Sequence, residues 1–187
     1  MSQAVLVDDA AALFRSLISE RAPSLEVRED ALTRSQYAYD ASNYRVPPAV
    51  VVRPRSDDEL CVVVQCARLA GLPLTARGSG TSMAGNAVGR GAVVDLSRHM
   101  NRVIEIRPSD RTAVVQAGAR LATLQTAAAA HGLMFAPDPS SGSRVTVGDA
   151  WLVESDAAAS WQGKGLDPDE IERRRQGVVD RGRTQLG

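Results

Sequence analysis

The stretch best suited to bind a negatively charged group is a glycine-rich loop at residues 77–86, which reads Arg-Gly-Ser-Gly-Thr-Ser-Met-Ala-Gly-Asn. Its glycines remove side chains, so backbone N–H groups can approach a phosphate closely and point at it together. Its hydroxyl and amide side chains add donors, and the arginine at its start can pair with phosphate. From the loop alone, a surface loop without a ligand is an equally good interpretation. The candidate contacts are Arg77, Gly78, Ser79, Gly80, Thr81, Ser82, Met83, Gly85 and Asn86.

The loop matches neither of two common phosphate-binding motifs. A P-loop ends in Gly-Lys-Ser or Gly-Lys-Thr, and this loop contains no lysine. The nicotinamide-dinucleotide fingerprint has its third glycine where Met83 stands, and it continues as a helix. Here a strand is predicted after the loop instead, so both of those nucleotide sites are excluded.

A second loop, at residues 137–148, begins with Pro-Asp-Pro and continues with serines and glycine. Its two prolines restrict the backbone, so the loop is rigid enough to hold a ring system. Taken alone, such a stretch is more often a plain connection between elements.

The remaining candidates favour structural interpretations. The tyrosine-rich stretch at residues 37–44 is interpreted as a capped turn packed against a sheet, with ligand contact as the alternative. His99 and His131 have no second ligand and no nucleophile at motif spacing, so both are predicted to be structural. No cluster has metal-ligand spacing, so no metal site is predicted. No residue stands out as a catalytic base.

Composition excludes several classes of protein. The 22 basic and 22 acidic residues cancel, which argues against nucleic acid as the main partner. No run approaches the length of a membrane span, and no signal peptide is evident, so a cytoplasmic protein is expected. Cys61 and Cys66 lie five residues apart on a predicted helix, so we expect buried free thiols and no intrahelical disulfide.

The elements that must position these loops follow from hydrophobic patterning. We predict strands at residues 49–52 and 72–76, with a helix between them that begins with a capping box at Ser56 and ends at Gly71. This order favours parallel strands. The further expected elements are a strand at residues 92–96, a hairpin from 103–106 and 113–116, and a helix at 121–130.

The sequence divides into three parts. Residues 1–36 are a helical lead-in, residues 37–148 contain the tyrosine-rich stretch and both candidate loops, and residues 149–187 are a polar tail that is expected to be flexible. In the lead-in, Asp8 or Asp9 is the expected cap of a helix that reaches Glu20. The predicted buried face of this helix consists of Ala12, Leu13, Leu17 and Ile18.

Taken together, residues 39–45, 48–52, 77–86, 94–97 and 137–140 resemble the start of an FAD-linked oxidase domain, the fold of p-cresol methylhydroxylase and vanillyl-alcohol oxidase. The resemblance is strongest to bacterial FAD- and iron–sulfur-binding D-lactate and D-2-hydroxyglutarate dehydrogenases. It implies an α+β fold in which two subdomains hold FAD, with the first loop wrapping the pyrophosphate. It also implies hydride transfer from a 2-hydroxy acid to the flavin. The residues expected near the flavin and ribityl end are Pro137, Asp138, Ser143, Val147 and Gly148.

After Gly148 the sequence departs from the family pattern. We therefore expect the first subdomain of this fold without the second one, which leaves the flavin site incomplete and an apolar face uncovered. Three interpretations of the function remain open: an incomplete flavoenzyme, a non-catalytic remnant or interaction module, and one half of a split enzyme completed by a partner chain.

Overall fold

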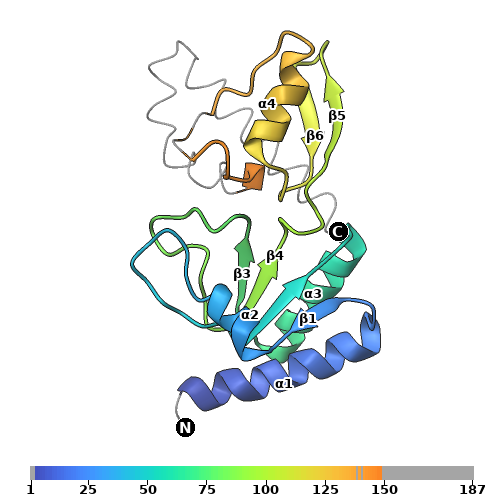
Figure 1. Ribbon diagram of the computed structural model, residues 1–187. Coiled ribbons are helices and arrows are strands. Elements are labelled where there is room, and N and C mark those ends of the chain that lie inside the picture. The colour runs from blue at the N-terminus through green and yellow to red at the C-terminus, as the bar shows by residue number, and fades with distance from the viewer. Residues whose placement is uncertain (1–2, 138, 140, 149–187) are drawn as a thin grey trace, which may run out of the picture. The chain divides into compact units, whose positions relative to one another are not determined.

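The computed structural model describes residues 3–137, 139 and 141–148 (Figure 1). The predicted tail at 149–187 and Asp138 lie outside these residues. In chain order the elements are α1 (Gln3–Arg21), β1 (Glu26–Arg28), α2 (Ala31–Gln36), β2 (Val50–Arg53), α3 (Asp57–Ala70), β3 (Leu74–Arg77), β4 (Ala92–Asp95), β5 (Val103–Arg107), β6 (Thr112–Val115) and α4 (Leu121–Ala129).

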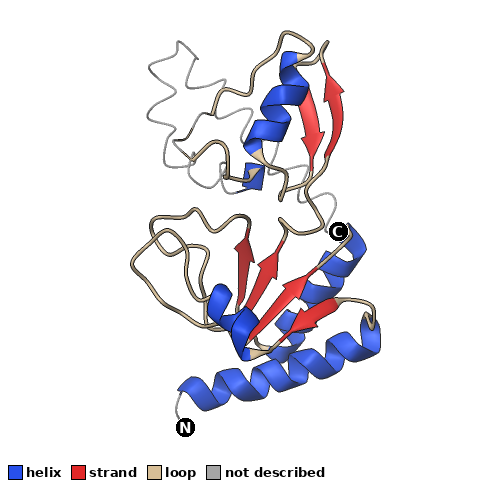
Figure 2. Cartoon of the chain, in the orientation of Figure 1, coloured by secondary structure: helices blue, strands red, loops and turns tan. Residues whose placement is uncertain are grey.

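Four strands form one sheet in the order β1-β2-β4-β3 (Figure 2). The pairs β2–β4 and β3–β4 are parallel, which confirms the parallel arrangement predicted from the strand–helix–strand pattern. β1 pairs antiparallel with β2. In the register of β3 with β4, Arg77 lies opposite Asp95. The glycine-rich loop and the segment after β4 therefore leave the sheet at the same edge.

The core of this sheet lies between β2, β4 and the helices α1 and α3. Val50 and Val52 of β2 and Val94 of β4 are buried in one cluster with residues of both helices. Because side chains alternate along a strand, α1 and α3 cover the face of the sheet that these residues share. α3 begins as predicted: the Ser56 hydroxyl accepts from Glu59 N–H at 3.2 Å. The Glu59 carboxylate, however, accepts from Arg55 N–H rather than from Ser56, so the capping box is not reciprocal.

The prediction for α1 was wrong in two respects. The helix already begins at Gln3, several residues before the expected aspartate cap. Of the predicted face, Ile18 is buried and Leu17 packs against the core, but Leu13 is 48% exposed and Ala12 is exposed as well. Ala11 and Phe14 are buried instead. Apolar residues occur on more than one side of this helix, so periodicity alone did not identify the face that meets the sheet. The predicted burial is confirmed for Cys66 and wrong for Cys61, which is exposed; both are free thiols, as expected.

The predicted hairpin forms a second, two-stranded sheet, in which β5 and β6 pair antiparallel with a register shift between Val103 and Glu105. The predicted helix after the hairpin is α4. Leu121 of α4 packs with Val145 and Phe135 in a small separate cluster. The described part of this domain is therefore mixed helix and sheet, with one sheet that contains parallel strands and one antiparallel hairpin.

A partly buried polar network joins the first sheet to the tyrosine segment. Arg53 donates to Glu26 at 2.6 Å, and Tyr37 donates to Asp95 at 2.5 Å. Burial would raise the pKa of Glu26, but hydrogen bonds from His99 and Arg53 outweigh this effect and hold it below the usual value of 4.5. His99 thus has the structural position that was predicted for it, at 3.2 Å from Glu26.

This network predicts acid sensitivity. Since the pKa of Glu26 is lowered in the folded state, its contribution to stability is present above the unfolded-state pKa and is lost as the pH falls through the folded-state pKa. We expect Glu26→Gln to lower the free energy of unfolding at pH 7 by about 1 kcal/mol and to flatten its decline at acid pH. Urea unfolding at several pH values measures both effects. The control is Glu29→Gln, in the exposed ion pair with Arg15; an equal effect there would contradict the prediction.

Candidate functional site

The glycine-rich loop starts at the end of β3 and is shaped by glycine at two points. Gly80 and Gly85 have φ of 69° and 80°, which side-chain-bearing residues rarely adopt. A Cβ at Gly80 would lie 2.5 Å from Arg77 Nη2, and one at Gly85 would lie 2.6 Å from Tyr44 Cδ2. The loop therefore closes tightly on the side chains of Arg77 and Tyr44.

Two side chains expected to contact phosphate also hold the loop in shape. Arg77 Nη1 donates to the carbonyl oxygen of Ala87 at 3.0 Å, and its guanidinium lies 5.1 Å from the centre of the Tyr37 ring. Ser82 Oγ accepts from the N–H groups of Ala84 and Asn86 at 3.3 and 3.2 Å. The contacts of Arg77 and Ser82 with a ligand stay predictions, as do those of the other loop residues.

The tyrosine-rich segment contains the capped turn expected of it. Asp40 accepts from the N–H and hydroxyl of Ser42 at 2.9 and 2.5 Å, and from Ala87 N–H at 3.3 Å. Burial would raise the pKa of Asp40, but these hydrogen bonds and the charge of Arg77 hold it below its usual value. The turn is thus bonded to the end of the glycine-rich loop, while the Tyr44 ring lies against Gly85.

A polar cavity of about 500 Å³ lies next to this loop, and its lining comes from three separate segments. The lining residues are Ser79, Ser97, Asn101, Gly118, Arg120 and Thr123. Ser79 alone among them had been predicted as a site residue. Ser97 belongs to a segment that carried the family resemblance, and this was the available signal for it. The other four had no motif to mark them, because the fold brings them together from distant positions in the sequence.

The start of α4 gives this cavity a positive side. Arg120 is the residue before the helix, with extended backbone angles and no side-chain cap, and Thr123 lies in the first turn. Helix N-termini carry partial positive charge and unpaired N–H groups, which favour anions. Within the described part of the chain, no ion pair involves Arg120.

The second predicted loop lies against the segment that leads into α4. Val147 N–H donates to Ala119 oxygen at 2.8 Å, and Gly148 N–H donates to Ala117 oxygen at 2.9 Å. Arg144 carbonyl oxygen accepts from the Ser79 hydroxyl, so the structure brings the two predicted loops together. Pro137 is buried and Ser143 is exposed, and neither is part of the cavity lining. Asp138 lies outside the described residues.

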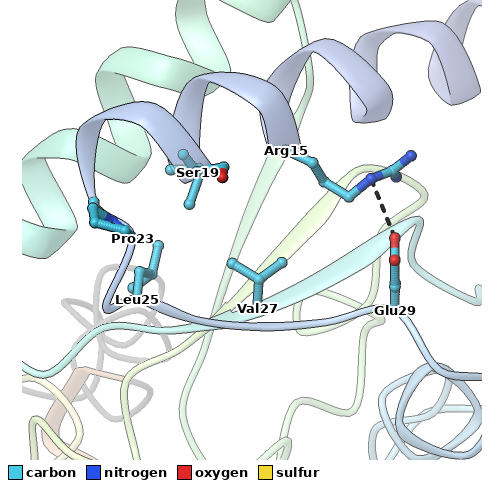
Figure 3. A pocket seen from close by; sticks show the side chains of 8 residues that line it. Arg15, Ser19, Pro23, Leu25, Val27 and Glu29 are labelled. Atoms are coloured by element: carbon cyan, nitrogen blue, oxygen red, sulfur yellow. Dashed lines mark ion pairs between the residues drawn. The ribbon is translucent and has the colours of Figure 1, made fainter.

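A smaller cavity of about 260 Å³ lies between α1 and β1 (Figure 3). Its lining is mainly aliphatic, including Leu25 and Val27, and an ion pair of 3.2 Å joins Arg15 to Glu29 at its edge. None of the predicted site residues reaches it. The larger polar cavity is therefore the better candidate for a phosphate-containing ligand.

Two features that the sequence predicts to be absent, a metal site and a membrane span, can be checked in the residues that the structure describes. These residues contain no group of three or more histidine, cysteine or acidic side chains arranged to hold a metal ion. Among the described helices, none is both long and apolar enough to cross a membrane.

His131, the second histidine of the chain, is exposed just after α4, and its backbone N–H donates to Ala128 oxygen.

Comparison of the sequence with known proteins identifies relatives of this chain. Over 139 residues the chain is 40% identical to D-2-hydroxyglutarate dehydrogenase of Pseudomonas putida, which covers 71% of the chain but only 13% of that protein. It is 36% identical over 117 residues to the glycolate oxidase subunit GlcD of Bacillus subtilis, covering 62% of the chain and 25% of that protein. The chain thus spans a small part of the length of these relatives.

Solved structures show the same fold. The 4-ethylphenol oxidase of Gulosibacter chungangensis superposes with a TM-score of 0.57 at 26% identity, covering 79% of this chain and 29% of the oxidase. p-Cresol methylhydroxylase has a TM-score of 0.58 at 17% identity, covering 78% and 29%. The family model described as "FAD binding domain" matches residues 48–157, which is more than half of the chain. The resemblance noted in the sequence is therefore confirmed, and the chain belongs to the FAD binding domain family.

Proposed function

We propose that this chain supplies the FAD-binding part of a flavin-dependent oxidoreductase that oxidises a 2-hydroxy acid. The observation that carries the proposal is the tightly folded glycine-rich loop beside a polar cavity whose lining includes a cation, Arg120. The relatives named as D-2-hydroxyglutarate dehydrogenase and glycolate oxidase support the substrate class.

The residues present fit a dinucleotide. Its pyrophosphate needs N–H and hydroxyl donors together with positive charge, which the loop, the N-terminus of α4 and Arg120 offer. The cavity volume of about 500 Å³ lies within the usual range for ligand sites. When bound, the flavin supplies the redox chemistry by accepting a hydride equivalent, and the protein binds and orients it.

The role of the other predicted residues is part of the same proposal. Ser79, Thr81 and Asn86 offer polar side chains along the loop, and Val147 and Gly148 lie beside the segment that enters α4. We place the pyrophosphate at the loop and the flavin end toward residues 137–148. A cytoplasmic location and a 2-hydroxy acid as substrate belong to this proposal as well.

A second candidate is one half of a split flavoenzyme, completed by another polypeptide. Exposed apolar side chains on the hairpin and after α4 favour it: Ile104, Val114 and Met134 are 58%, 39% and 77% exposed. Such side chains are suited to contact with further protein. In that case the chain would bind FAD only together with the complementary polypeptide.

The test is the visible absorption spectrum of the purified full chain after incubation with FAD and desalting. We expect retained flavin at about one per chain, and about tenfold weaker FAD binding in Gly80→Ala, because alanine is strained at positive φ and its Cβ would meet Arg77. Gly132→Ala is the matched control, since Gly132 has φ of 67° but nothing within 4 Å of the added Cβ.

Each outcome separates the candidates. Retained flavin that is bleached by a D-2-hydroxy acid supports the oxidoreductase. Retention by Gly80→Ala equal to that of the unaltered chain would contradict the proposed site. A chain that retains no flavin alone, and retains it once the complementary polypeptide is added, would favour the split enzyme.

A further inference from the structure

One wall of the polar cavity consists of two side chains whose own hydrogen bonds determine what they offer a ligand. Ser97 follows β4, and both its N–H and its hydroxyl donate to Asp95 Oδ1, at 2.8 and 2.7 Å. The other oxygen of Asp95 accepts from the Tyr37 hydroxyl at 2.5 Å. Arg53 in turn donates to that tyrosine oxygen at 3.3 and 3.4 Å, which directs the tyrosine proton to Asp95.

The Asp95 side chain is therefore surrounded by donors and is itself almost completely buried, with 4% exposure. A carboxylate in this position only accepts hydrogen bonds, so the proton of the Ser97 hydroxyl is directed to it. What Ser97 presents to the cavity is the remaining lone-pair side of Oγ.

The same reasoning applies to Asn101. Its Nδ2 lies 3.0 Å from the carbonyl oxygen of Ser97 and 3.4 Å from that of Arg98. Carbonyl oxygens accept only, so the amide NH₂ faces them, and Oδ1 is the atom of Asn101 that is left to a ligand. Two neighbouring side chains of the lining thus both offer acceptors.

We propose that this wall selects a hydrogen-bond donor of the ligand, a hydroxyl or N–H group, and that Asp95 is the positioning residue that sets the polarity of Ser97. The lining then offers two chemically different kinds of group: acceptors at Ser97 and Asn101, and positive charge at Arg120. This inference rests on the proposed function, because FAD carries sugar and ribityl hydroxyls as donors and an ionised pyrophosphate as the anion.

The test compares two probes, FAD and inorganic pyrophosphate, by titration calorimetry with the full chain. Pyrophosphate has the anionic groups but no hydroxyl donor. We expect Ser97→Ala to weaken FAD binding about 3- to 10-fold, the range for one hydrogen bond, and to leave pyrophosphate binding unchanged. Arg120→Gln should weaken both. Ser97→Thr keeps the hydroxyl and should restore FAD affinity, while Ser109→Ala, in the exposed turn between β5 and β6, should change neither.

The outcomes separate this inference from the proposed function. If Ser97→Ala weakens both probes equally, Ser97 has only a structural role and the inference is overturned. If it changes neither while the unaltered chain binds FAD, the inference is also overturned, and the proposed function stands. If the unaltered chain binds pyrophosphate but not FAD, both are overturned.

Discussion

Phe14→Ala is expected to lower the free energy of unfolding by about 3–5 kcal/mol, the range for removing a fully buried phenylalanine. The Phe14 side chain has 0% exposure and lies in the core cluster between α1, α3 and the first sheet. Alanine would leave a cavity in this cluster, which also contains Val50 and Val52 of β2. Chemical denaturation of the full chain, followed by far-UV circular dichroism, measures the change.

The adjacent leucine is the matched control for this result. Leu13 is also a large apolar residue of α1, but it is 48% exposed. Leu13→Ala should therefore change the free energy of unfolding by less than about 0.5 kcal/mol. The comparison distinguishes the observed orientation of α1 from the one predicted by sequence; a larger effect at Leu13 than at Phe14 would contradict the structure.

Gly118→Ala is expected to destabilise the protein by about 3 kcal/mol and to abolish measurable FAD retention. A Cβ at Gly118 would lie 2.1 Å from the carbonyl oxygen of Leu96 and 2.7 Å from that of Met100. Both are backbone atoms, so no side chain can move aside. The two segments must separate, which breaks the hydrogen bond from Gly118 N–H to Met100 oxygen and displaces Ser97 from the cavity.

Thermal unfolding and the desalting assay measure these two effects of Gly118→Ala. Ala117→Ser is the control, since it adds a single heavy atom at the neighbouring exposed position. It should unfold and retain FAD like the unaltered chain. A Gly118→Ala protein with normal stability and normal flavin retention would show that this close approach has no importance for the fold or the site.

Features with a local cause could be predicted from sequence. The Ser56 cap, the parallel strands on either side of α3 and the β5–β6 hairpin follow from residue types within a short window, because capping and strand patterning act over a few residues. The glycine-rich loop was recognisable for the same reason. These features sufficed for the family resemblance and for FAD as the expected cofactor, both of which the comparisons support.

Tertiary contacts decided the rest. Which face of α1 is buried depends on the sheet beneath it, and the sequence offers apolar residues on more than one side. The direction of Arg77 depends on Ala87, at the end of its own loop, and on Tyr37, which comes from another segment. The cavity joins Ser97, Gly118 and other residues that are distant in the sequence.

The sequence by itself thus determined the loop that is predicted to bind phosphate, the order of the elements from β2 to α4, and the family. Only the tertiary structure decided which side chains surround the cavity and whether each offers a donor or an acceptor. The physical reason is that hydrogen-bond polarity at Ser97 is set by Asp95, and Asp95 is in turn held by Tyr37, 58 residues away in the chain. Such a relation exists only once the sheet has brought these residues together.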